Sequence, residues 1–411
     1  MRQEQPIGFA AGPRSRPVTA VLVFAAALLV AALVSEFANR SVLSTAALFL
    51  VVGFLGGPGM LEIIPVEAGG EVAGRFAELA LFAVLFTDGM RVDVTELRRR
   101  WLVPARALLL GMPLALGVTA ALGHALAGLS WRDALLVAAV LSPTDPVFAA
   151  ALVGREEIPT RLRHMLNIES GINDGFALPL VVVLLAWGSP AELHAATLAL
   201  EVAGGIALGL VLPWLAAVVE RSRFFSVGRA YEPIFAFAVG LLLFATASLT
   251  HANEYLAAFA GGATLATASP MLAEAFHRFG ESVAELLKLA AVMVFGALMS
   301  PTWLREVGAG DLAFAIAALL LARPIGLGLA LVGSGMRGSE LLAALWFGPK
   351  GFASVVFGLL VLHSALPNAD HLFHLVALVV AASILAHSST DVLVARRLAA
   401  GDLRGGSREP A

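Results

Sequence analysis

Two short motifs place carboxylates inside long apolar runs of this chain. The first reads SPTDPV over residues 142–147 and holds Thr144 and Asp145, and the second reads ESGINDG over residues 169–175 and holds Asp174. A charged side chain at the centre of a bilayer costs roughly 2.5–3.5 kcal/mol on insertion scales, so an intramembrane carboxylate is a functional candidate by default. The two aspartates are therefore the chain's first candidates for chemistry.

The ESGINDG motif has the spacing of a helix that presents several oxygen ligands together. Ser170 and Asp174 are four residues apart, as are Glu169 and Asn173, so the two pairs lie on adjoining faces of a helix. Two carboxylates, a hydroxyl and an amide suit a small hard cation. The chain contains no cysteine and no convincing histidine cluster, so the residues give no indication of a transition-metal site.

The SPTDPV motif predicts a break in a membrane helix. Pro143 and Pro146 each lack a backbone N–H and clash with the preceding turn. Non-helical backbone at membrane depth survives only where protein or a watery cavity surrounds it. The break therefore frees carbonyl groups around Thr144 and leaves half-helix ends that face one another, which is the construction of an ion site.

Each of these polar residues also has a purely structural interpretation. Polar side chains can hold membrane helices together by interhelical hydrogen bonds. For each of Ser142, Thr144, Ser170 and Asn173 this structural role stays open as an alternative to ion binding. Glu169 is as well explained by a buried ion pair with Arg323 as by ion binding. Lys350 lies in FGPKGF, residues 347–352, and either pairs with an acid or neutralises facing helix C-termini; we favour the second.

Three further polar positions are interpreted as structural. Asp88 lies near the end of an apolar run, so we expect a solvated carboxylate at a helix end. His371 and His374 have metal-like spacing, but only Asp370 lies near them in the sequence, so we expect no metal there.

Composition sets the class of protein. Of the 411 residues, 59% are hydrophobic and 14% are charged, with a mean hydropathy of +0.87, whereas a soluble domain has roughly 25% charged residues. This indicates a polytopic membrane protein whose partner is the lipid bilayer. The absence of cysteine excludes disulfides and thiolate chemistry, and no basic tract is dense enough for nucleic acid. We expect no cofactor.

Runs of roughly 17–25 apolar residues predict an all-α fold with about thirteen transmembrane helices. Residues 1–17 are a predicted N-terminal tail, 18–395 the transmembrane domain and 396–411 a short cytoplasmic tail. The predicted spans are 18–34, 42–57, 73–90, 101–128, 132–153, 161–187, 192–219, 231–250, 254–269, 279–300, 311–335, 339–362 and 370–395.

Basic residues in the connecting segments predict the orientation. Most of them gather on one side, in stretches such as 91–100, 155–163 and 221–229, and basic loops remain in the cytoplasm. This predicts an N-terminus outside, a C-terminus inside and, with the other features, location in a cell inner membrane.

The order of features occurs twice along the chain. Arg106 in one span precedes the break at Pro143–Pro146 in the next, and Arg323 in a later span precedes the break at 347–352. We predict two repeats, 18–187 and 231–395, joined by a linking helix at 192–219. Because one linking helix separates the two repeats of six helices, the repeats run in opposite directions across the membrane, as in many secondary transporters. The basic residues inside predicted spans are Arg106, Lys288, Arg323 and Lys350, and Lys288 does not take part in this repeated order.

At SPTDPV followed by ESGINDG the sequence resembles the cation:proton antiporter-1 family of bacterial sodium/proton exchangers, and the resemblance covers nearly the whole chain. It implies that Asp174 carries both the cation and the proton, with Thr144, Asp145 and Ser170 completing the site. It also implies a structural pair of Glu169 with Arg323 and a homodimer in which a core bundle moves against a scaffold.

Two positions depart from the family's usual pattern. Relatives usually place arginine where Lys350 stands, so the charge is kept but a bidentate fork is lost. A glutamate is common where this chain has Thr87 and Asp88, which puts any role of that helix end in doubt.

The sequence thus predicts a secondary transporter that exchanges Na⁺, or Li⁺ or K⁺, for protons, and the family resemblance implies one cation per proton without net charge movement. A sodium-coupled symporter of an organic solute on a similar broken-helix plan is the alternative. The GAGD stretch at 308–311 resembles intramembrane aspartyl proteases, but the chain lacks their Tyr-Asp pair and Asp311 falls at a predicted helix start, so we predict no enzyme. A channel would need filter loops or charge rings repeated by symmetry.

Overall fold

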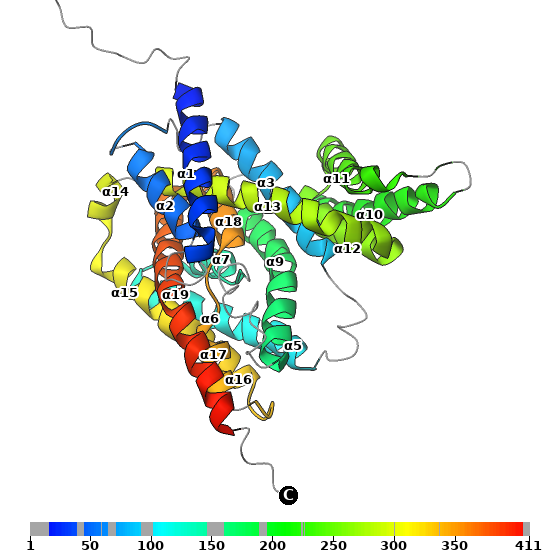
Figure 1. The fold of residues 1–411 in the computed structure, drawn as a ribbon. Coiled ribbons are helices and arrows are strands. Elements are labelled where there is room, and N and C mark those ends of the chain that lie inside the picture. Colours follow the sequence, from blue (N-terminus) through cyan, green and yellow to red (C-terminus); the bar gives the residue numbers. More distant parts are fainter. Residues whose placement is uncertain are drawn as a thin grey trace, which may run out of the picture.

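The fold is entirely helical in the part of the chain that the structure describes. The computed structural model describes residues 16–38, 45–58, 60–64, 71–91, 102–145, 160–188, 195–222, 225, 227–299, 301–336 and 338–405, and within these ranges every regular element is a helix (Figure 1). The predicted all-α fold class is confirmed.

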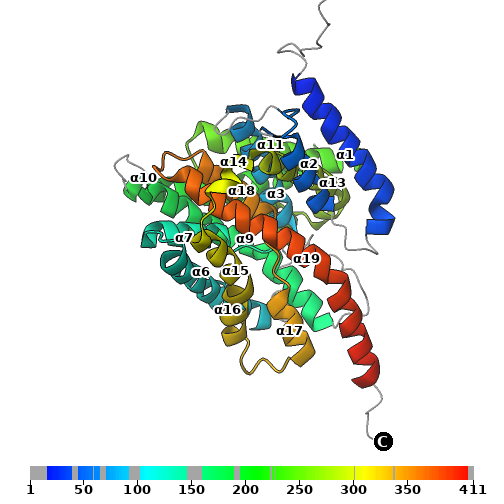
Figure 2. The ribbon, with the colours of Figure 1, turned by 90° about the vertical axis from the view of Figure 1, so that its left-hand side faces the viewer.

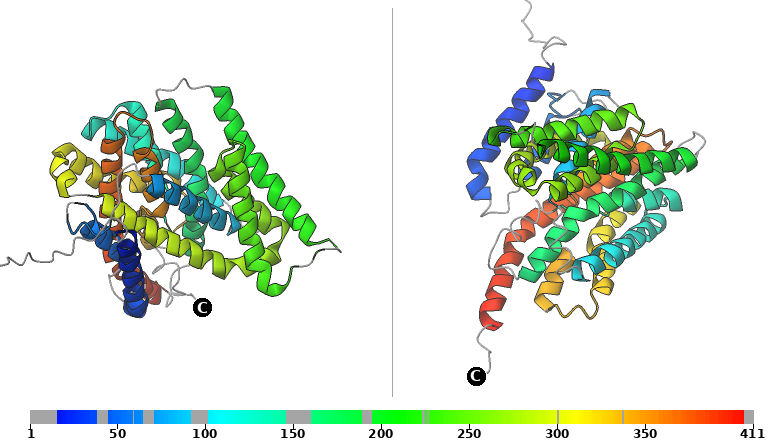
Figure 3. Two further views of the ribbon diagram at one scale, coloured as in Figure 1. Left: turned by 90° about the horizontal axis from the view of Figure 1, so that it is seen from above. Right: turned by 90° about the vertical axis from the view of Figure 1, so that its right-hand side faces the viewer.

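One group of helices forms a bundle that we call the scaffold bundle. In it α3 packs on α12 and α13, α2 packs on α13, and α10 packs on α12. Figure 3 shows α10 to α12, coloured green, at one side of the molecule, with the yellow-green α13 running from them across it. The members are α1 (Arg16–Ala38), α2 (Thr45–Gly56), α3 (Glu71–Met90), α10 (Ala195–Glu220), the 3₁₀ turn η2 (Arg229–Tyr231), α11 (Glu232–Leu249), α12 (Glu254–Ala268) and α13 (Pro270–Leu298).

The other helices form what we call the core bundle. Here α6 packs on α7 and α16, α7 packs on α9, and α18 packs on α19, and Figure 2 shows α19 running along this bundle. After the short α14 (Pro301–Glu306), its second half begins at α15. The members are α5 (Leu102–Arg106), η1 (Ala107–Gly111), α6 (Met112–Leu126), α7 (Trp131–Val140), α9 (Thr160–Gly188), α15 (Ala309–Ala317), η3 (Ala318–Ala322), α16 (Arg323–Ala330), α17 (Gly338–Trp346), α18 (Phe352–Leu362) and α19 (Ala369–Gly405).

The helices coincide with the predicted spans apart from their ends. Helix α13 begins at Pro270 instead of 279, and α19 continues to Gly405, so part of the predicted tail 396–411 is helical. Within the described ranges six helices are long and apolar enough to cross a membrane: Leu102–Leu126, Arg161–Trp187, Ala196–Glu220, Arg229–Leu249, Ala309–Ala330 and Ala369–His387. The protein is a multi-pass membrane protein. The count of thirteen stays a prediction because segments such as 146–159 lie outside the described residues.

A π-helical turn occurs at corresponding places in both halves of the core bundle. It reads ALLLG in η1 and ALLLA in η3, and a proline follows two residues after each turn, at Pro113 and Pro324. A π-bulge is a usual accommodation for an irregularity in a helix. This register pairs Arg323 with Met112, so the sequence-based correspondence of Arg323 with Arg106 is wrong.

Arg106 has a different task from Arg323. It precedes η1, and its Nη2 donates a hydrogen bond of 2.6 Å to the carbonyl of Val332, just after α16. Arg161 of α9 donates to the carbonyls of Ser334 and Gly335 in the same turn. Both arginines therefore donate to backbone carbonyl groups of the turn that follows α16.

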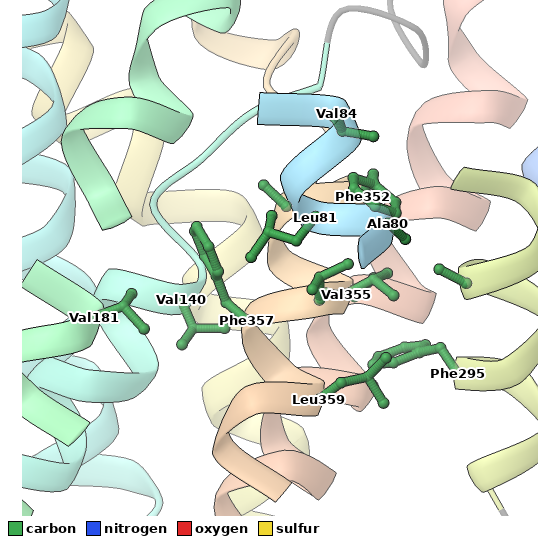
Figure 4. Close-up of a cluster of buried hydrophobic side chains, with 14 of the residues drawn as sticks. Ala80, Leu81, Val84, Val140, Val181, Phe295, Phe352, Val355, Phe357 and Leu359 are labelled. Carbon is green, nitrogen blue, oxygen red and sulfur yellow. The ribbon is translucent and has the colours of Figure 1, made fainter. Parts of the chain in front are cut away.

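Apolar side chains from both bundles meet around α18. Helix α18 is buried along nearly its whole length, and Figure 4 shows its side chains between those of α3 and α13 on one side and of α7 and α9 on the other. The labelled residues are Ala80, Leu81, Val84, Val140, Val181, Phe295, Phe352, Val355, Phe357 and Leu359. The broken helix of the second half is thus held in the middle of the molecule.

Facing glycines set the distance between α3 and α12. A Cβ at Gly262 would lie 2.1 Å from the Phe86 carbonyl oxygen, and a Cβ at Gly89 would lie 2.3 Å from the Phe259 carbonyl oxygen. Only glycine allows two backbones to approach so closely, as in other membrane helix pairs.

We predict that Gly262→Ala lowers the stability of the detergent-solubilised protein by about 1–3 kcal/mol, because the added methyl group forces the scaffold helices apart. A lower midpoint in a thermal unfolding scan measures this. Gly117→Ala is the matched control, since a Cβ there has no neighbour within 4 Å; equal midpoints for the two variants would contradict the argument.

Candidate cation site

The first helix break lies where the prolines predict it. Helix α7 ends at Val140, and the chain continues without regular structure through Ser142 to Asp145. Thr144 and Asp145 are both buried, with exposed fractions of 5% and 7%. Pro146 lies outside the described residues.

The second break lies directly against the first. Helix α17 ends at Trp346 and α18 begins at Phe352. The backbone N–H of Asp145 donates to the Pro349 carbonyl at 3.0 Å, and the backbone N–H of Phe352 donates to Asp145 Oδ2 at 3.1 Å. A Cβ at Gly351 would lie 2.0 Å from the Cβ of Asp145, so this approach requires glycine.

Asp145 therefore caps a half-helix. Phe352 is the first residue of α18, and its N–H is one of the donors that the start of a helix leaves free. A carboxylate at this position is stabilised by the positive end of the helix dipole as well as by the hydrogen bond. Asp145 thus joins the two breaks while keeping its charge inside the protein.

Helix α9 brings the second motif to the same place. Asn173 Nδ2 donates to Thr144 Oγ1 at 2.7 Å and lies 3.3 Å from the Thr144 carbonyl oxygen. The hydroxyl oxygens of Thr144 and Ser170 are 3.5 Å apart. These three predicted site residues are therefore in direct contact.

Two buried oxygens at this point have no hydrogen-bond partner among the described residues. They are Asn173 Oδ1 and Asp174 Oδ1, on side chains with exposed fractions of 2% and 8%. A buried acceptor without a partner loses its hydration without compensation, which costs about 1–3 kcal/mol and more for a charged group. Such oxygens fit a ligand with positive charge.

Glu169 is occupied by Arg323. The guanidinium binds it with two parallel hydrogen bonds, Nη1 to Oε1 at 2.6 Å and Nη2 to Oε2 at 2.9 Å, and Nε donates to the Ala344 carbonyl at 3.0 Å. A Cβ at Gly348 would lie 2.2 Å from the Cδ of Arg323. The pair connects α9, α16 and α17 next to the second break.

Lys350 lies beside this pair. It lines a cavity of about 30 Å³ together with Leu141, at the C-terminal end of α7, and with Glu169 and Arg323. This position is compatible with both predicted roles, because a helix C-terminus and a carboxylate lie on the same cavity. Its role stays a prediction.

The sequence analysis missed two residues on α19. Ser383 Oγ accepts a hydrogen bond of 2.8 Å from the backbone N–H of Lys350. The ring of His387 has Nδ1 at 2.8 Å from the Ser383 carbonyl oxygen and Nε2 at 3.0 Å from the Trp346 carbonyl oxygen. They tie both ends of the second break to α19. The sequence signal that could have indicated them is that Ser383 and His387 are two polar residues four positions apart in an apolar span.

The prediction for Asp88 was wrong. Its side chain is 6% exposed, and Oδ1 lies 3.4 Å from Arg91 Nη1. The solvated helix end expected from the sequence is instead covered, because α3 lies between α12 and α13. Asp88 and Asp145 both act electrostatically on Asp174.

The other polar positions are structural. Asp311 Oδ2 accepts from the backbone N–H of Gly308 at 3.0 Å and caps α15, as its predicted place at a helix start requires. His371 Nε2 lies 3.4 Å from Asp311 Oδ1, and the ring of His374 packs against Trp303.

The family profile described as sodium/hydrogen exchanger, transmembrane, matches residues 24–396. The chain belongs to this exchanger family. The K(+)/H(+) antiporter NhaP2 of Shewanella oneidensis is 27% identical over 381 residues, which are 89% of this chain and 65% of that protein. The K(+)/H(+) antiporter NhaP of Alkalimonas amylolytica is 26% identical over 369 residues, which are 88% of this chain and 63% of that protein. The chain therefore spans about two thirds or less of these relatives.

A solved structure shows the same exchanger fold. The sodium proton antiporter MjNhaP1 from Methanocaldococcus jannaschii at pH 8 matches with a TM-score of 0.76 over 93% of this chain and 99% of that chain, at 19% identity. The family resemblance carried by SPTDPV and ESGINDG is confirmed.

We predict that Arg323→Ala mainly lowers stability, because it strands Glu169 as an unpaired buried charge, at a cost of about 3–5 kcal/mol. Thermal unfolding in detergent measures the loss. The double variant Glu169→Ala with Arg323→Ala should recover part of it. A double variant that melts no higher than Arg323→Ala would show that the pair does not set this stability.

Proposed function

We propose that this exchanger exchanges a monovalent cation for protons, with Asp174 as the group that binds both. The observation that carries the proposal is the unpartnered buried oxygen of Asp174, on a carboxyl group that acts electrostatically with Asp145 at the contact of the two broken helices. Membership of the exchanger family supports it, as do the antiporter names of the relatives.

The residues around Asp174 fit a small hard cation. Thr144 supplies a hydroxyl and a carbonyl, Ser170 a hydroxyl, and Asp145 a carboxylate that the start of α18 holds in place. Oxygen ligands of this kind suit Na⁺, Li⁺ and K⁺ alike. Glu169 is a weaker candidate as a ligand, because both of its oxygens accept hydrogen bonds from Arg323.

One carboxylate is enough to couple the two movements. A cation or a proton neutralises Asp174, so the loaded core bundle can move past the scaffold bundle. The empty site keeps a net charge that opposes its passage through an apolar barrier. If Asp174 takes one proton or one monovalent cation in turn, each cycle exchanges them one for one and moves no net charge.

The alternative of an organic-solute symporter has less support. The cavity beside the two breaks has a volume of about 30 Å³, which is the share of a single water molecule in the liquid, whereas pockets for organic ligands occupy roughly 300–1,000 Å³. We therefore propose that the substrates are ions. We also propose that the protein is a homodimer in a cell inner membrane, with its N-terminus outside.

The transported ion is identified by adding each chloride salt in turn to everted vesicles with a pre-formed pH gradient. Dissipation of the gradient by Na⁺, Li⁺ or K⁺ supports cation/proton exchange and ranks the ions. No dissipation by any of them, together with sodium-dependent uptake of a labelled organic anion, would favour the symporter.

We predict that the proton and the cation compete at Asp174. In proteoliposomes, the apparent KM for the cation should rise about tenfold per unit of acidification below the carboxylate's pKa, with little change in maximal rate. Asp174→Asn should show no exchange at any pH. A KM that stays flat between about pH 8 and pH 5.5, or uptake driven by membrane potential alone, would exclude this mechanism.

We predict that Asp145→Asn abolishes exchange in a folded protein. Asparagine retains an oxygen that accepts from the Phe352 N–H, so the contact between the breaks persists, but the negative charge is lost. Proton flux in proteoliposomes and the thermal midpoint in detergent measure the two effects. Wild-type exchange by a normally folded variant would show that the charge of Asp145 has no part in ion binding.

A further inference from the structure

Lys288 brings a positive charge to the site from the scaffold bundle. Its side chain is buried, with an exposed fraction of 8%, and Nζ lies 5.9 Å from the centroid of the Phe352 ring. Phe352 is the residue whose backbone N–H holds Asp145. The ammonium therefore lies across the bundle interface from the two helix breaks, where it is also placed for a cation–π interaction.

The charges around Lys288 are mostly negative. Those that act on it are Asp145 in the first break, Asp88 on α3 and Glu285 on its own helix, with Arg91 on α3 opposing them. A buried ammonium without such compensation would cost several kcal/mol. The carboxylates that would attract a transported cation thus also stabilise a cation that belongs to the protein.

Further charges lead away from Lys288 along α13. Glu285 and Glu281 follow at intervals of three and four residues toward the start of the helix, so they lie along one side of it. Glu281 Oε1 accepts a hydrogen bond of 2.6 Å from Arg91 Nη2, and His277 Nδ1 lies 3.4 Å from Glu281 Oε2. Lys288 is therefore the innermost member of a charged row on the scaffold bundle.

The fixed positive charge of Lys288 opposes the binding of a transported cation near it. With about 6 Å between two unit charges and an effective dielectric constant of about 20, the repulsion changes a binding constant by about a hundredfold, and water in the site reduces this to about tenfold. Lys288 would not move with the core bundle, because α13 belongs to the scaffold bundle. The repulsion therefore acts on the ion while the two bundles have the relative position seen in this structure.

We propose that Lys288 sets the cation affinity of the exchanger: it is a tethered cation that competes with the transported cation for the acidic site of Asp88, Asp145 and Asp174, and so weakens its apparent affinity. The inference rests on the proposed cation/proton exchange. It assigns Lys288 no proton transfer, since its charge stays constant through the cycle.

The test measures the apparent KM for Na⁺ and for K⁺ at alkaline pH in proteoliposomes that hold wild type, Lys288→Gln, Lys288→Met or Lys288→Arg. Removing the charge should lower KM about tenfold, while arginine should keep it near the wild-type value. Arg278→Gln is the matched control, because it removes the same charge from an exposed position of α13 and should leave KM unchanged.

An unchanged or higher KM in folded Lys288→Gln would overturn the inference. So would complete loss of exchange in a folded neutral variant, because the lysine would then be needed to carry a proton. If neither neutral variant folds, Glu285→Gln gives the converse test: it removes a carboxylate that compensates Lys288 but is not part of the acidic site, so KM must rise severalfold; an unchanged KM would overturn the inference. Absence of cation-driven proton flux in the wild type itself would instead reject the proposed function.

Discussion

The contact between the two helix breaks is the constraint on which the rest of the site depends. Asp145 donates its backbone N–H to Pro349 and accepts from the N–H of Phe352. Backbone groups at membrane depth need partners inside the protein, and here each break supplies partners for the other. The close approach requires Gly351, and it holds the Asp145 carboxylate at the start of α18, a buried apolar helix.

Charge is divided between two different tasks in the core bundle. Glu169 and Arg323 form two hydrogen bonds with each other and connect three helices, so they contribute to the structure of the core bundle. Asp174, one turn further along α9, has a buried oxygen without such a partner. Two carboxylates on one helix thus differ in their surroundings, because only Glu169 meets a guanidinium.

The scaffold bundle contributes charge as well as support. Asp88 on α3 and Lys288 on α13 both act on the carboxylates of the core bundle. In the proposed exchange, the electrostatic environment of the ion would therefore depend on which part of the scaffold bundle faces the site. Movement of one bundle against the other would change that environment without any change in the ligands themselves.

The sequence by itself determined the membrane class, the positions of most helices, both breaks and the polar residues Thr144, Ser170 and Asn173 that lie at the first of them. These follow from local properties: apolar length, the missing N–H of proline, and the four-residue spacing that puts Ser170 and Asp174 on one face of a helix. Only the tertiary structure decided which helices meet. It buried Asp88 against expectation, gave Arg106 and Arg323 unrelated partners, and placed Ser383, His387 and Lys288 beside the breaks. The physical reason is that helical periodicity specifies the face on which a side chain lies, whereas its neighbours across that face come from other helices. Val332 lies 226 residues from Arg106 and Trp346 lies 41 residues from His387, and only packing of the helices brings such residues together.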